Sequence, residues 1–173
     1  MLNRILICLD DLEHTKAIAS YSAQVIQPNN THITLFHCIQ SADLDLGAPE
    51  LELNENDKAA IDTVLEEYYS GKGITGDFYC REVFNSAKEL LKSNGFNENQ
   101  ISEKLVIKDI DIAACILQEA YNYGYTTIII AKRREIKLPI TSLGSVTERV
   151  VANAIGKTVW IVSIATSPWF RML

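Results

Sequence analysis

Five short apolar runs set the strongest limit on what this chain can fold into. Each run is rich in β-branched residues, and segments with helical periodicity separate the runs along the chain. The first of them, residues 4–9, is nearly continuous, which is typical of a strand buried on both faces of a parallel sheet. Because parallel strands need long, right-handed returns, we expect an α/β fold with a doubly wound, open, five-stranded, Rossmann-like sheet. The expected strands are residues 4–9, 31–39, 101–107, 126–131 and 157–164.

The segments between these runs predict helices with recognisable ends. Helical spacing of apolar residues extends to about 26 in the first segment, and it recurs at 57–69, 83–93, 112–123 and 145–154. Either Asp109 or Asp111 is expected to cap the fourth helix, which should stop at Gly124. Ser145 and Glu148 match the spacing of a capping box at the start of the last helix. The alternation of helices and strands therefore runs through the whole chain.

Residues 40–57 interrupt this alternation. The segment contains six acidic residues together with Gly47 and Pro49, and its leucines show no sustained period. It lacks the spacing of a calcium-binding loop. We therefore expect a solvated acidic loop here.

The chain of 173 residues is long enough for one domain with a sizeable core, and we expect a single domain over 1–173. Its formal net charge of -6 argues against nucleic acid as a partner. No apolar run reaches the roughly 20 residues of a membrane helix, so we expect a cytoplasmic protein with no membrane contact. The four cysteines show no CxxC pair and no zinc-type spacing, which favours packing thiols and no metal site.

Two polar strand exits indicate where a ligand should bind. Asp10 follows the first strand, and the fourth strand ends at Ala131 with three cations directly after it. Open parallel sheets bind ligands beyond the carboxyl ends of their strands. Asp10 has two interpretations, one as an acceptor for a ribose hydroxyl or an adenine amine and one as a helix-capping acid. Gly144 and Ser145 open a helix whose N-terminus offers amides to an anion.

These features together resemble the universal stress protein family. The resemblance rests on "RILICLD", "ITLFHCI", the spacing from Ala131 through Arg134 to Gly144-Ser145, and "LGSVTERVV" before "KTVWIVS". It implies a five-stranded sheet of order 3-2-1-4-5, a homodimer, and either an ATP-binding or a non-binding type. It also implies ATP, with Mg, as the cofactor. The cofactor-binding residues expected from it are Cys8, Leu9, Asp10, Cys38, Ala131, Arg133, Arg134, Gly144, Ser145 and Val146.

The chain departs from the family's ATP-binding pattern at several positions. Asp11 and Leu12 replace the usual Gly-Ser after the aspartate, Ala131 replaces the first loop glycine, and Arg134 replaces the second. Arg134 either clamps phosphate oxygens as a bidentate donor or fills the space that glycine leaves for the phosphate. Asp11 adds a negative charge near the same crevice.

Two functions follow from these observations. The first is a stress-response module, not an enzyme, that binds an adenine nucleotide and signals through dimer or partner contacts. The second is an interaction protein whose pocket is vestigial. In either case we expect a homodimer built on the last strand, with Trp160, and on the apolar tail 165–173, although the tail folding back on its own domain is the alternative.

Overall fold

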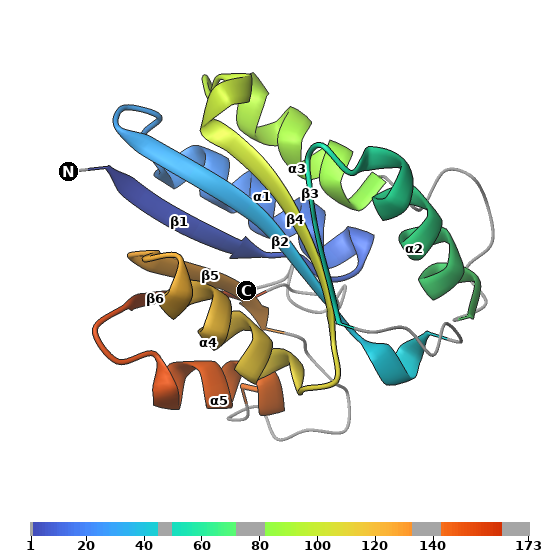
Figure 1. Cartoon of the computed structure of the whole chain (residues 1–173). Helices are drawn as coiled ribbons and strands as arrows, with labels where there is room; N and C mark the ends of the chain where they lie inside the picture. The colour runs from blue at the N-terminus through green and yellow to red at the C-terminus, as the bar shows by residue number, and fades with distance from the viewer. Residues whose placement is uncertain (1, 45–49, 72–81, 133–142, 164–173) are drawn as a thin grey trace, which may run out of the picture.

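The computed structural model describes residues 2–44, 50–71, 82–132 and 143–163, and these form one six-stranded sheet with helices on both faces (Figure 1). The strand order is β3-β4-β2-β1-β5-β6. The strands are β1 (Asn3–Cys8), β2 (Thr31–Gln40), β3 (Leu51–Asn54), β4 (Ile101–Lys108), β5 (Thr127–Lys132) and β6 (Thr158–Ser163). All neighbouring pairs are parallel except β3 and β4. The expected α/β fold is confirmed.

The expected strand count and order are wrong for the whole sheet, which has six strands where five were expected in the order 3-2-1-4-5. The additional strand, β3, lies within the segment expected to be a loop, and it pairs antiparallel with β4 at the sheet edge. Leu53 of β3 is 7% exposed and faces the core, while Glu52 points to lysines of β4. The alternation of leucine and acid is thus the pattern of an edge strand with one buried face. Without β3, the remaining strands follow the order β4-β2-β1-β5-β6.

The helices divide between the two faces of the sheet (Figure 1). One core joins Ile5 and Ile7 of β1 to apolar residues of α1 (Leu12–Val25), α2 (Lys58–Gly71) and α3 (Glu82–Ser93). The other joins Leu6 and Cys8 of the same strand to α4 (Ile112–Asn122) and α5 (Ser145–Asn153). Alternate residues of a strand point to opposite faces. The apolar run of β1 therefore serves both cores, as its composition predicted.

The structure shows which residues cap the N-termini of α4 and α5. Asp111, and not Asp109, caps α4, because its side chain accepts a hydrogen bond from the N–H of Ala114. The predicted capping box at α5 is wrong, since the N-cap residue is Gly144 and Ser145 is already helical. The carboxylate of Glu148 instead accepts from the N–H of Leu143 at 3.1 Å. The first-turn amides of α5 therefore lack a side-chain cap from their N-cap residue.

A buried ion pair fixes α3 on the sheet. Glu103 of β4 is 1% exposed, and its Oε1 lies 2.6 Å from Nζ of Lys88. Burial acts to lower the pKa of Lys88, but hydrogen bonds and charges from Glu103 and Glu98 outweigh it, so its pKa lies above the ordinary 10.5. Lys88 thus remains charged wherever the pair is formed.

Candidate functional site

A cavity of about 230 Å³ lies at the carboxyl ends of the central strands and is closed on one side by the start of α5. Eight of the ten predicted cofactor-binding residues line it, namely Cys8, Leu9, Asp10, Cys38, Ala131, Gly144, Ser145 and Val146. The other two, Arg133 and Arg134, lie outside the described residues. The cavity also contains His37, Asp43, Tyr68, Ile112, Ile116, Ile130, Leu143 and Thr147. Sequence reasoning therefore located most of this wall but missed the residues that close it.

The register of the sheet explains why these distant segments meet. Ile7 of β1 pairs with Ile129 of β5 on one side and with Leu35 of β2 on the other. Parallel strands in register end at the same edge of the sheet. The residues that follow β1 and β5 therefore face each other across the cavity, with Cys38 of β2 beside them.

Asp10 and Asp11 perform separate tasks at the end of β1. Asp11 is the N-cap of α1, and its carboxylate accepts from the N–H of His14 and contacts the His14 ring Nδ1 at 2.7 Å. Asp10 lines the cavity, and its backbone N–H donates to Oγ1 of Thr15 at 3.3 Å. The helix-capping interpretation of Asp10 is therefore wrong, because its neighbour caps the helix.

The same three side chains, Asp10, Asp11 and His14, bring one potential ligand atom each within 4.8 Å of one another. The bond between Asp11 and His14, together with the helix cap, accounts for the approach of two of them. We therefore assign no metal to this group.

The start of α5 presents a row of backbone amides to the cavity. Gly144 has φ 86° and ψ 148°, a conformation that favours glycine strongly, and its carbonyl accepts the N–H of Glu148. The N–H groups of the first turn have no partner within the helix, and glycine has no side chain to satisfy them. Ser145, Val146 and Thr147 line the cavity. This terminus is thus suited to an anion, with the positive end of the helix dipole behind it.

The floor of the cavity consists of buried, uncharged thiols and aliphatic side chains. Burial is the main cause that raises the pKa of Cys8, and a hydrogen bond with Cys115 followed by burial raises the pKa of Cys38. Both thiols are therefore protonated in neutral solution. With Ile112 and Ile116 of α4 beside them, they form an apolar surface of the kind that a flat aromatic base packs against.

His37 and Tyr68 also line the cavity. His37 is 3% exposed, its Nδ1 lies 3.1 Å from the carbonyl oxygen of Leu9, and its ring meets that of Tyr68 edge to face at 6.0 Å. A signal for His37 was present in the sequence, since it is a polar residue inside an apolar strand next to Cys38. Tyr68 gave no such signal, because only the packing of α2 brings it to the cavity.

None of the helices in the described ranges has the length and the apolar character that crossing a bilayer would require.

The sheet and its cavity define a Rossmann-like α/β protein with a cavity at the carboxyl ends of its parallel strands. The chain belongs to the universal stress protein family, whose family profile matches residues 1–163. A comparison with curated proteins finds no match.

Solved structures of universal stress proteins share this fold. One from Archaeoglobus fulgidus has 13% identity and a TM-score of 0.61, covering 94% of this chain and 99% of its own. A universal stress protein in complex with cAMP has 14% identity and a TM-score of 0.62, covering 95% and 98%. The Archaeoglobus fulgidus protein in complex with dAMP has 14% identity and a TM-score of 0.57, covering 92% and 97%.

Proposed function

We propose that this chain is a cytoplasmic stress-response module that binds an adenine nucleotide in the cavity and signals through dimer or partner contacts. It acts by binding and not by catalysis. The observation that carries the proposal is the single cavity that joins the predicted residues of β1, β2, β5 and α5. The cAMP and dAMP complexes of universal stress proteins with this fold support the choice of ligand class.

The cavity suits the nucleoside part of such a ligand. Its volume of about 230 Å³ lies just below the roughly 300 Å³ at which pockets for drug-sized ligands begin. We therefore place only the base and the ribose inside the cavity. A polyphosphate chain then extends beyond it. The base packs on Cys38 and Ile116, the ribose hydroxyls donate to Asp10, and the phosphates lie against the first-turn amides of α5. Each part of the ligand, base, ribose and phosphate, thus contacts a different wall of the cavity.

The described residues that line the cavity carry negative but no positive side chains, so we propose that a phosphate ligand binds together with a cation. Asp10 and Asp43 are acidic, and no lysine or arginine is among the described residues that line the cavity. A triphosphate brings about four negative charges to this place, so we propose that ATP binds with Mg²⁺ to offset them. A monophosphate needs this help less.

The first prediction tests the ligand. Denaturing the purified protein should release an adenine nucleotide that mass spectrometry identifies. Adding millimolar ATP with Mg²⁺ should raise the Tm of the emptied protein, and chelating the metal should reduce the shift for ATP more than for AMP. Release of no nucleotide, together with no Tm shift for ATP or AMP, would establish the interaction module with a vestigial pocket instead.

The dimer is a separate part of the proposal, supported by the edge of the sheet. β6 pairs only with β5, so its other edge is open in the described chain. Ile161 is 37% exposed on this strand, and Trp160 meets Tyr21 of α1 edge to face at 6.4 Å. An open apolar edge strand is a template for pairing with a second copy.

The second prediction therefore concerns Ile161. Ile161→Lys places a charge on the open edge and should convert the homodimer to a monomer in light scattering at micromolar concentration. Val151→Lys is the matched control, because Val151 is 44% exposed on α5 and lies off this edge. A wild-type protein that is already monomeric would refute the dimer, and equal loss in both variants would refute the role of β6. The tail 165–173, predicted to contribute, lies outside the described residues.

A further inference from the structure

The face of the sheet that carries α4 changes character along its strands. Towards the carboxyl ends, Phe36, Cys38 and Val106 are buried under α4. Towards the amino ends, the same face carries Arg4, His32 and other polar residues, and a second cavity of about 390 Å³ lies there. Central strands of a parallel sheet are normally apolar on both faces. A polar stretch in this place is consequently a feature that packing alone does not require.

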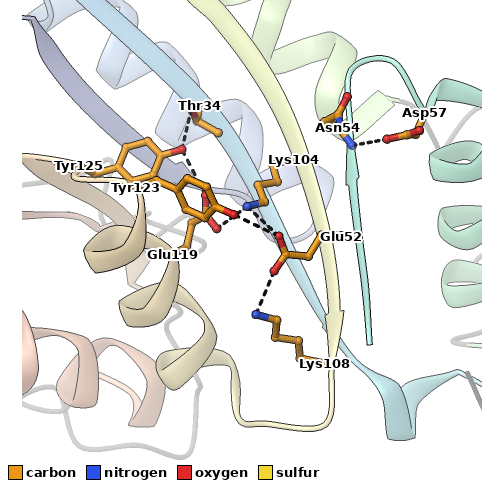
Figure 2. A network of polar contacts seen from close by, with 9 residues as sticks. All are labelled: Thr34, Glu52, Asn54, Asp57, Lys104, Lys108, Glu119, Tyr123 and Tyr125. Atoms are coloured by element: carbon orange, nitrogen blue, oxygen red, sulfur yellow. Dashed lines mark hydrogen bonds and ion pairs between the residues drawn. The ribbon is translucent and has the colours of Figure 1, made fainter. Parts of the chain in front are cut away.

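Most charges around this cavity are already paired (Figure 2). Lys104 of β4 contacts Glu119 of α4 at 2.7 Å and Glu52 of β3 at 3.2 Å. Lys108 contacts Glu52 at 3.1 Å. Two lysines therefore face two glutamates, and the cluster of Glu52, Lys104, Lys108 and Glu119 carries no net charge. Glu52, Lys104 and Glu119 line the cavity, and Lys108, outside it, completes this neutral cluster.

A hydroxyl network continues this wall towards β1. The hydroxyl of Tyr125 donates to Oγ1 of Thr34 at 3.0 Å, and it lies 3.3 Å from Glu119 (Figure 2). Glu103 also borders the cavity, but its side chain pairs with Lys88 on the other face of the sheet. Its charge is therefore directed away from this cavity.

Arg4 is the cation at this cavity that takes part in none of these ion pairs. It lies beside His32 in the register of β1 and β2, and its guanidinium stacks over the ring of Tyr125 at 5.2 Å. Its Nε is buried without a hydrogen-bond partner, and no ion pair joins Arg4 to another of the described residues. A buried donor of this kind carries a desolvation cost until an acceptor reaches it. Nε itself is closed to a ligand, so the guanidinium offers the cavity its two terminal NH2 groups, which have no acceptor among the described residues.

The neighbours of Arg4 indicate what kind of acceptor fits. Nε2 of His32 lies 3.0 Å from Oγ of Ser102, so the adjacent residues are neutral hydrogen-bonding groups. Burial and then the charge of Arg4 lower the pKa of His32, while Glu55 at the exposed rim opposes them. One unpaired cation with an acid at the rim favours a single negative charge over a dianion. A planar carboxylate matches the guanidinium fork.

We propose that this cavity is a second binding site, separate from the nucleotide cavity, for a small organic monocarboxylate. The carboxylate accepts two hydrogen bonds from Arg4, and the hydrocarbon part packs against the exposed ring of Tyr123. The two sites share one face of the sheet at opposite ends of its strands. The proposal does not depend on nucleotide binding.

The pKa of the His32 ring, followed by proton NMR, reports binding at this cavity. The chain has three histidines, so proton NMR resolves their ring signals, and a His32→Asn variant assigns the one required. Benzoate is the probe, with inorganic phosphate as the contrast at equal ionic strength. Bound benzoate should raise the pKa of His32, because its charge offsets that of Arg4, and the effect should saturate.

Variants of Arg4 test the contact itself. Arg4→Gln should weaken benzoate binding at least about tenfold, as expected for a charged hydrogen bond. Arg4→Lys keeps the charge but removes the fork, so it should also weaken binding while preserving the fold. Arg149→Gln is the control, because Arg149 pairs with Asp111 away from this cavity. Absence of a saturable shift, equal weakening in the control, or tighter binding of phosphate than of benzoate would overturn the proposal.

Discussion

Replacing Lys88 with methionine should lower the free energy of unfolding by about 3 to 5 kcal/mol, the cost of leaving a buried charge without its partner. Glu103 is 1% exposed, so water cannot take the place of the lysine. Methionine keeps the length of the side chain and its packing against β4. Chemical denaturation at neutral pH measures the effect.

The same helix offers a matched control for this change. Lys92 lies one turn further along α3 and pairs with Glu98, but its side chain is 41% exposed, so Lys92→Met should change stability little. The double variant Lys88→Met with Glu103→Leu should regain most of the loss, because no buried charge remains. If Lys88→Met alone were as stable as wild type, Lys88 would not be needed to stabilise the buried charge of Glu103.

The raised pKa of Lys88 fixes the pH range of this effect. Because the folded pKa exceeds the ordinary 10.5, the contribution of the pair is fully present below that pH and is lost as the pH rises through the folded pKa. The difference between wild type and Lys88→Met should therefore stay constant from neutral pH to about pH 10 and shrink only above it.

Replacing Gly144 with valine should abolish the ATP-dependent rise in Tm. A Cβ at this position meets no atom within 4 Å, so the added side chain projects into open space at the cavity, where a phosphate would approach the amides. The backbone has φ 86°, which a β-branched residue adopts at a cost of about 1 to 3 kcal/mol. Titration of nucleotide into the variant, followed by calorimetry, checks the loss of affinity.

Gly124→Val is a control that separates the two effects of Gly144→Val, namely backbone strain and loss of the phosphate site. Gly124 also has a positive φ, 67°, and a Cβ there meets nothing within 4 Å, but it follows α4 and does not line the cavity that Gly144 borders. Gly124→Val should therefore lower the Tm of the free protein in a similar way and leave nucleotide affinity unchanged. Loss of affinity in both variants would attribute the effect to general strain rather than to a blocked phosphate site.

The strands and the main wall of the cavity could be predicted because local sequence encodes them. The apolar run that contains Ile5 and Ile7 indicates a buried strand without any knowledge of its neighbours, and Asp10 marks its polar end. The resemblance then supplied the order of the parallel strands, which no single strand encodes. Cys38 and Gly144, which the resemblance assigned to ligand binding, both line the cavity, and their role there stays a prediction.

The parts that sequence reasoning missed depend on tertiary contacts. Strand β3 is short, and it exists because Leu53 reaches the core while Glu52 finds two lysines on the neighbouring strand. Tyr68 reaches the cavity only because α2 packs beside β3. Arg4, which borders the second cavity, looked like an ordinary first residue of the strand expected at 4–9, since its lack of an ion-pair partner among the described residues appears only in three dimensions.

The two borders of the sheet differ in a way that limits how many copies can join. At one border β6 offers six residues, Thr158–Ser163, with an apolar character, while at the other β3 offers only the four residues Leu51–Asn54, among them the charged Glu52. A short, charged strand is a poor template for a further chain. Pairing of two copies through β6 uses the favourable border of both, and each outer border of the resulting continuous sheet is then the poor one. If the proposed dimer forms in this way, growth into a fibre would be disfavoured and assembly would stop at two copies.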